Sequence, residues 1–187
     1  MSRGASARLF AALDPPTEVG EELLRWARGA LRAGGERGPR LLAPASLHIT
    51  LMFLGERPFE EVEALAEALG AAAERGSACE LWTGAPVWLP PRRPRALAVE
   101  VHEQEGDLAA LQRDLAGALC EVAGLQPPRR FRAHLTVARA RSGAHADDLL
   151  PPTPALRFPA EEVVLYRSYL EPQGARYERL AAAPLMG

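Results

Sequence analysis

Two segments of this chain share a His-x-Thr phrase: Leu47-His48-Ile49-Thr50-Leu51-Met52-Phe53 and Phe131-Arg132-Ala133-His134-Leu135-Thr136-Val137. Both runs alternate in the way that predicts a β-strand. Residues i and i+2 lie on the same face of a strand, so each phrase sets an imidazole beside a hydroxyl. Two of only four histidines in the chain carry the phrase, which favours a shared function over two unrelated strand histidines with satisfied hydrogen bonds.

Two histidines on one concave face suit acid–base chemistry at phosphorus. A neutral imidazole can take a proton from water while an imidazolium gives one to a leaving oxygen, and histidine populates both forms near neutral pH. The neighbouring threonine hydroxyls can donate hydrogen bonds to phosphate oxygens between the rings. Phosphoryl transfer depends mainly on such positioning and charge stabilisation.

Composition indicates an ordinary globular protein of 187 residues, with 48% hydrophobic and 25% charged side chains. No apolar run is long enough to span a bilayer, and residues 1–6 lack the apolar stretch of a signal peptide. Cys79 and Cys120 are isolated and show no disulfide or zinc spacing. These features predict a cytoplasmic protein with no membrane partner.

The order strand, helix, His-x-Thr strand occurs twice along the chain. The first copy is predicted over residues 8–13, 15–31 (with Asp14 as the helix cap) and 47–53, and the second over residues 96–101, 108–122 and 131–137. A helix over 59–73, a strand over 78–83, a loop over 88–94 and three C-terminal strands complete the pattern. We therefore expect one α+β domain over residues 1–187, bilobal and pseudo-symmetric, with antiparallel sheets. The approximate lobe boundary is 84–95, and the two motif strands line a central cleft.

The net charge of −2 does not attract nucleic acid to the protein as a whole. The local distribution of arginine is more informative. Arginines bracket the second motif and form either a phosphate-attracting rim or a solvated edge: Arg129, Arg130, Arg132, Arg139 and Arg141. The motifs offer no carboxylate at metal-ligand spacing, so no metal is predicted.

These residues resemble the two-histidine (2H) phosphoesterase superfamily, and within it the RNA 2',3'-cyclic phosphodiesterases, also called 2'-5' RNA ligases. The resemblance rests on Arg8-Leu9-Phe10, on residues 44–51 with Phe53-Leu54-Gly55, on residues 131–139, on Leu165-Tyr166-Arg167-Ser168, and on residues 174–177. Two departures are Ala133, where the family usually has proline, and the segment 84–90, which replaces a Gly-x-Phe-Pro-like stretch. The resemblance implies a bilobal α+β domain that hydrolyses its substrate without a metal or other cofactor.

The same resemblance implies roles for individual residues. His48 is the proton donor and His134 the proton acceptor, Thr50 and Thr136 hold the phosphate, and Arg139 lies beside it. Phe10 stacks on a terminal base or belongs to the core.

The activity implied is hydrolysis of a terminal RNA 2',3'-cyclic phosphate to a 2'-phosphate, with RNA 3' ends or small cyclic nucleotides as partners. Two alternatives stay open: ligation or cleavage of 2'-5' linkages by the same in-line chemistry, and a non-catalytic module that binds nucleotides or RNA ends. The sequence predicts neither the physiological RNA nor the oligomeric state.

Overall fold

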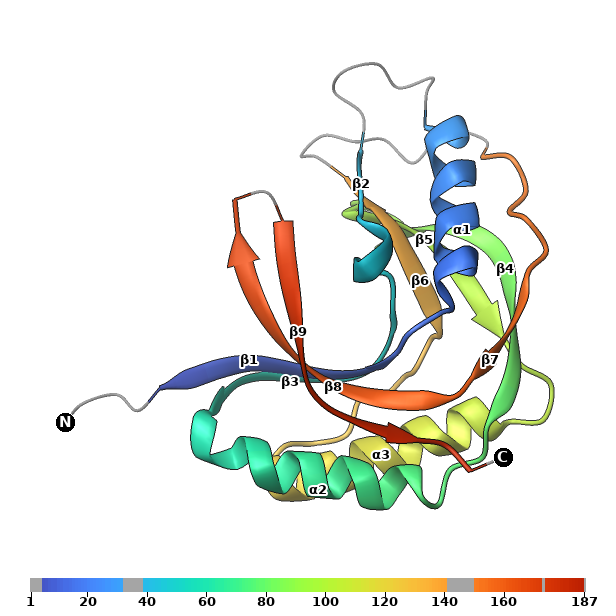
Figure 1. Ribbon diagram of the computed structural model, residues 1–187. Coiled ribbons are helices and arrows are strands. Elements are labelled where there is room, and N and C mark those ends of the chain that lie inside the picture. Colours follow the sequence, from blue (N-terminus) through green and yellow to red (C-terminus); the bar gives the residue numbers. More distant parts are fainter. Residues whose placement is uncertain (1–4, 32–38, 141–149, 173, 187) are drawn as a thin grey trace.

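A computed structural model describes residues 5–31, 39–140, 150–172 and 174–186, and these fold around one curled β-sheet (Figure 1). Its strands run in the order β7-β4-β5-β6-β3-β1-β8-β9, with β2 paired to β6, and every strand pairing is antiparallel. The strands are β1 (Ser6–Leu13), β2 (Arg40–Leu41), β3 (Ile49–Pro58), β4 (Cys79–Leu89), β5 (Ala96–His102), β6 (His134–Arg139), β7 (Arg157–Ala160), β8 (Glu162–Glu171) and β9 (Gly174–Pro184). The predicted α+β class with antiparallel pairing is confirmed.

Three α-helices pack on this sheet: α1 (Thr17–Ala30), α2 (Val62–Ala73) and α3 (Asp107–Ala123). Two short 3₁₀ helices, η2 (Pro44–Ser46) and η3 (Phe59–Glu61), precede β3 and α2. Each α-helix buries one apolar stripe, as the 3.6-residue period of its sequence predicts. Gly124 ends α3 in the left-handed region (φ 64°), where glycine has no steric penalty. No helix in the described ranges is long and apolar enough to cross a membrane.

The two copies of the predicted repeat lie side by side in the sheet. β1, α1 and β3 form the first copy, and β5, α3 and β6 form the second; β3 and β6 are neighbours at the centre. The helices cross over between the copies, because α1 contacts β6 and α3 contacts β3. α2 packs beside α3 and against β8 and β9 (Figure 1). This exchange of helices holds the two halves of the sheet together.

The motif strands begin later than their alternation predicts. β3 begins at Ile49 rather than at Leu47, and β6 begins at His134 rather than at Phe131. Before β3 the chain turns through η2, where the backbone amides at positions 46 and 47 donate to the carbonyls at positions 43 and 44. Each histidine therefore lies at the entrance of its strand.

The segment 84–95 lies in the hairpin between β4 and β5. The loop predicted over 88–94 is wrong at its start, because Trp88 and Leu89 continue β4 and pair with Leu97 and Ala96. Proline near the end of a strand misled the prediction, since strand ends tolerate it. The division into lobes at 84–95 stays a prediction.

β1 is buried on both faces. Leu9, Ala11 and Leu13 enter the main core, together with the buried faces of all three helices. On the opposite face a second, smaller cluster forms, with members Phe10, Ala12, Val164 and Tyr166. This second cluster lies directly beneath the candidate site.

Candidate functional site

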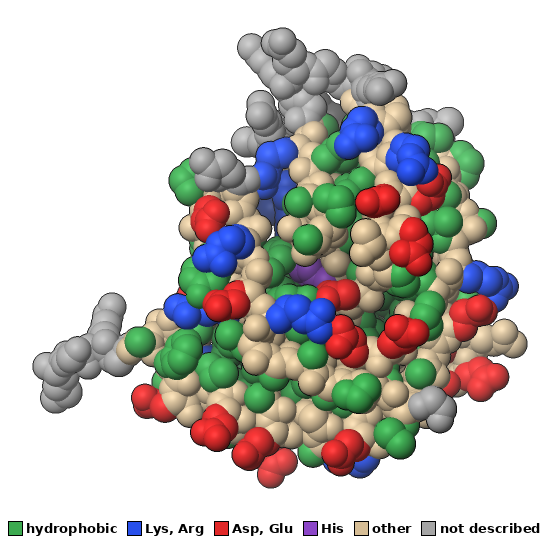
Figure 2. Space-filling model, in the orientation of Figure 1, with side chains coloured by type: hydrophobic (Ala, Val, Ile, Leu, Met, Phe, Trp, Pro, Cys, Tyr) green, Lys and Arg blue, Asp and Glu red, His purple; other side chains and the backbone are tan. Residues whose placement is uncertain are grey.

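A cavity of about 430 Å³ lies where β3 and β6 meet, and both motifs line it. Its walls include the residues predicted for phosphate chemistry: His48, Thr50, His134, Thr136 and Arg139. The space-filling view shows a histidine side chain at the bottom of a hollow near the centre of one face (Figure 2). The fold thus brings together side chains that are far apart in the sequence.

The charge of the cavity suits an anion. Arg8, Arg95 and Arg139 contribute to its wall, and no Asp or Glu is among the described residues that line it. A larger hollow of about 820 Å³ lies on the other side of Tyr177 and differs in charge, because three carboxylates and one guanidinium line it: Asp14, Glu161, Glu162 and Arg179. The smaller cavity is therefore the better phosphate site, since opposite charge without competing carboxylates favours an anion.

The two imidazoles are held in the same way. Nδ1 of His48 lies 3.0 Å from the carbonyl oxygen of Ser46, and Nδ1 of His134 lies 2.8 Å from that of Arg132. A carbonyl only accepts hydrogen bonds, so Nδ1 is the donor in both rings. In the neutral tautomer that this fixes, Nε2 keeps its lone pair and is free for the cavity.

The surroundings of His48 favour its neutral form. Its pKa is lowered from 6.5 to about 4, chiefly because burial strips hydration from the charged imidazolium and to a smaller extent because of the charge of Arg139 and the nearby His134. The hydrogen bond to Ser46 acts in the opposite direction, because it stabilises the protonated ring. A negative charge placed in this cavity would therefore find both an arginine and an imidazole able to gain a proton.

Phe10 forms the floor under His48. Their ring centroids are 4.8 Å apart, and on another side Phe10 stacks on Tyr166 at 5.1 Å. The Tyr166 hydroxyl donates to the Asp14 carboxylate (2.5 Å), which anchors this stack at its far end. Because only 3% of Phe10 is exposed, little of its ring is left for a nucleobase. The side chain packs in the second core cluster.

Thr50 and Thr136 are partly buried, and their hydroxyls make no hydrogen bond to another protein group within the described ranges. Both are thus available as neutral donors inside the cavity. Arg139 ends β6 and is exposed, yet its charge acts on His48 across the cavity. Of the other arginines around the second motif, Arg132 forms an ion pair with Glu100, and Arg141 lies outside the described residues.

Sequence reasoning missed several residues of the wall, chiefly Arg8, Arg95 and Phe53. A signal for Arg8 existed, because it stands two positions before Phe10 on the same strand. Phe53 is 66% exposed and lies 6.1 Å from Phe10, centroid to centroid. Strict alternation would place Phe53 on the core face with Ile49 and Leu51, and the irregular register of β3 against β1 turns it to the cavity instead. Arg95 had no local signal, since the β4–β5 hairpin brings it to the cavity.

The side chains that could ligate a metal are spread over the described part of the chain. Within the described ranges, no three His, Cys, Asp or Glu side chains gather as metal ligands. The two free cysteines, Cys79 and Cys120, lie outside the cavity wall. The polar side chains that line the cavity are two imidazoles, three guanidinium groups and the hydroxyl-bearing residues Ser46, Thr50, Thr136, Ser168 and Tyr177.

Comparison with known proteins finds related sequences and a related structure. The sequence model of the 2'-5' RNA ligase superfamily matches residues 15–171. An RNA 2',3'-cyclic phosphodiesterase of Thermus thermophilus is 33% identical over 190 residues, covering 96% of this chain and 91% of its own length. The Escherichia coli K12 protein of the same name is 31% identical over 173 residues, covering 92% and 93%. The crystal structure of E. coli LigT complexed with 3'-AMP superposes with a TM-score of 0.82 at 27% identity, covering 98% of this chain and all of that one.

Proposed function

The chain belongs to the 2'-5' RNA ligase superfamily, and from this membership and the cavity we infer that it is a metal-independent RNA 2',3'-cyclic phosphodiesterase. The observation that carries the inference is the matched pair of histidines, each held at Nδ1 by a carbonyl two residues earlier, in one arginine-lined cavity. That arrangement offers two Nε2 atoms to the two sides of a phosphorus centre. It suits an in-line displacement, which needs a proton acceptor on one side and a proton donor on the other.

In the proposed reaction, water attacks phosphorus and the 3' oxygen leaves, so that the cyclic phosphate becomes a 2'-phosphate. His134 takes a proton from the attacking water at Nε2, and His48 gives a proton to the leaving 3' oxygen. Thr50, Thr136 and Arg139 donate to the non-bridging oxygens, where negative charge builds in the transition state. The direction, with His48 as the donor, follows the family resemblance.

The low pKa of His48 agrees with this role only when substrate is bound. Within the protein alone, burial and the charge of Arg139 disfavour the imidazolium of His48. A phosphate anion placed between the rings supplies the missing counter-charge and raises the pKa. His48 thus becomes protonated in the complex, where the reaction needs its proton.

The proposed substrate class is an RNA 3' end or a small cyclic nucleotide. E. coli LigT, a structural relative, was crystallised with 3'-AMP, which supports a nucleotide in this cavity. We assign base contact to Phe53 rather than Phe10, because Phe53 is 66% exposed at the cavity wall whereas Phe10 is covered. A stacked base needs a ring face that is free. The cytoplasm is the proposed location.

The deciding experiment is product analysis on a short RNA that ends in a 2',3'-cyclic phosphate, with and without EDTA. The proposal expects a 2'-phosphate product and an unchanged rate in chelator. A parallel incubation with a 2'-5'-linked dinucleotide measures the related cleavage. A 3'-phosphate product, loss of activity in EDTA that one added metal restores, or binding without turnover would each overturn the proposal.

A further inference from the structure

The two catalytic histidines are held alike but their supports differ. Ser46, which holds His48, lies in η2, where the amides of Ser46 and Leu47 donate to the carbonyls of Ala43 and Pro44. Arg132, which holds His134, lies between the end of α3 and the start of β6, where residues 125–133 form no helix or strand. The neighbouring Ala133 carbonyl accepts a hydrogen bond from the Val101 amide (3.0 Å), but no helical turn holds Arg132 itself.

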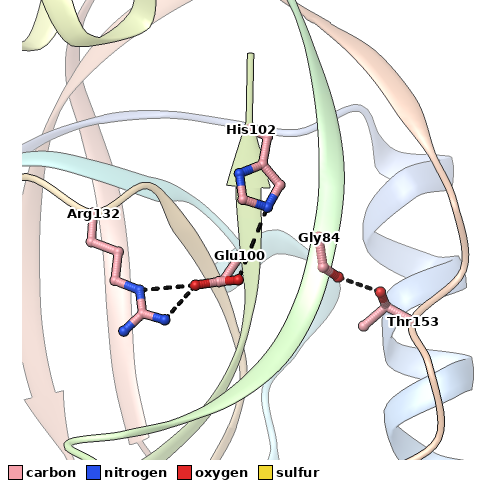
Figure 3. Close-up of polar contacts among 5 residues, drawn as sticks. All are labelled: Gly84, Glu100, His102, Arg132 and Thr153. Carbon is pink, nitrogen blue, oxygen red and sulfur yellow. Dashed lines mark hydrogen bonds and ion pairs between the residues drawn. The ribbon is translucent and has the colours of Figure 1, made fainter. Parts of the chain in front are cut away.

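A side-chain ion pair holds Arg132 instead. Nε of Arg132 lies 3.2 Å from Oε1 of Glu100, and its Nη2 also contacts Oε1 (Figure 3). Glu100 lies on β5 directly opposite His134 of β6 in the strand register. The carboxylate thus connects the strand beside His134 to the residue whose carbonyl holds the ring.

On the side away from Arg132, Glu100 lies near His102. Nε2 of His102 lies 4.0 Å from Oε2 of Glu100, so the two oxygens of this carboxylate face different partners (Figure 3). Gly84 on β4 leaves the room that His102 occupies, because a Cβ at position 84 would clash with Nε2 of that ring. Glu100 thus lies between Arg132, which it contacts through Oε1, and His102, with 24% of its side chain exposed.

We propose that Glu100 is a positioning residue for His134, acting through the side chain of Arg132. This proposal rests on the proposed function of His134 as the proton acceptor. With the ion pair in place, the Arg132 carbonyl stays 2.8 Å from Nδ1 and keeps the proton on that atom, so that Nε2 keeps its lone pair for water. Without the pair, the segment before β6 loses its side-chain anchor, and the ring samples other orientations and the other tautomer. Misplacing a catalytic group by about 1 Å costs up to roughly 10²-fold in rate.

The test compares Glu100→Gln with Glu80→Gln. Glu80 forms a similar ion pair with Arg157 (2.6 Å) between β4 and β7, and that pair contacts neither catalytic histidine nor its carbonyl. Glu100→Gln is expected to lower kcat on a small cyclic nucleotide about tenfold, with KM little changed, and to shift the limb of the pH profile that reports His134. Glu80→Gln is expected to change neither. Arg132→Gln should reproduce the loss, and the double variant with Glu100→Gln should be no slower than either single one.

Nitrogen NMR of the His134 ring provides a readout that needs no turnover. Wild type is expected to show one neutral tautomer with the proton on Nδ1, and Glu100→Gln a mixture. If the wild type turns over cyclic phosphate and Glu100→Gln matches it in kcat, pH profile and tautomer, the positioning role is wrong. If the wild type does not turn over cyclic phosphate but Glu100→Gln alters the ring, the proposed function fails while the positioning role stands.

Discussion

Ile49 and Leu135 pair across the junction of β3 and β6, and each is the middle residue of its His-x-Thr motif. Both side chains are buried in the main core, with 1% and 0% exposed. The pairing points the flanking histidines and threonines of both motifs to the other face, where the cavity lies. The core thus sets the distance between the two motif strands.

Shortening one of these core residues should therefore reduce activity as well as stability. Leu135→Ala is expected to cost about 2–5 kcal/mol of unfolding free energy, as cavity-forming substitutions do. Leu119→Ala is the matched control, since Leu119 is also fully buried but lies on α3, away from the cavity wall. Denaturant unfolding should give similar losses for both, whereas kcat of the folded protein should fall mainly in Leu135→Ala. Equal kcat values in the two variants would show that the junction does not set the catalytic geometry.

The pKa of His48 should respond to phosphate. In the free protein we expect an NMR titration near pH 4, and on addition of a 2'-nucleotide the pKa should rise to about neutrality, because the anion stabilises the imidazolium. The His48→Ala spectrum identifies the resonance. A free-state pKa near 6.5 would contradict the burial, and an unchanged pKa in the complex would contradict the donor role.

The same pKa predicts a pH dependence of stability. Because the folded pKa of about 4 lies below the ordinary value of 6.5, the unfolded chain binds more protons between these two values. The contribution of His48 to the free energy of unfolding is therefore complete above pH 6.5 and is lost as pH falls toward 4. Urea unfolding of wild type and His48→Ala across this range should show a shallower acid-side loss in the variant. Parallel curves would exclude this linkage.

Arg139 should matter more than either threonine. A charge-assisted hydrogen bond is roughly twice as strong as a neutral one, so Arg139→Ala is expected to reduce kcat/KM more than Thr50→Val or Thr136→Val. It should also weaken binding of a 2'-phosphate nucleotide, which calorimetry measures. Arg130→Ala is the control, because Arg130 is exposed outside the cavity wall. Small and equal effects of the two arginines would place Arg139 on the solvated edge.

Phe53→Ala separates base contact from chemistry. Loss of a stacked base costs about 1–3 kcal/mol, so KM for an RNA end should rise roughly 5- to 150-fold. Turnover of a cyclic phosphate that carries no base should be unaffected. Leu170→Ala removes another exposed apolar side chain from the cavity wall without removing an aromatic face, and it should change KM less. A larger effect of Leu170→Ala would mean that Phe53 does not stack.

The class of the fold and the residues of the motifs could be predicted from the sequence because both depend on local periodicity and on a repeated phrase. The late start of β3 after η2 could not be predicted, since the η2 turn depends on backbone hydrogen bonds before His48. Nor could the sequence place Arg95 or the ion pair of Glu100 with Arg132, because these depend on the register of β5 against its neighbours. For Phe10 it leaves base stacking and core packing open, and only the rings that surround it in the structure show how little of it is exposed.

The central claim, that His48 and His134 act as one acid–base pair, is tested most directly by turnover of an RNA 2',3'-cyclic phosphate in His48→Ala, His134→Ala and the double variant. Each single variant should stay folded and lose about 10²–10⁴-fold in kcat, the usual contribution of a positioned acid or base. The double variant should lose far less than the product of the two losses, because the groups act as a unit. Near-full activity in either folded single variant would contradict the account.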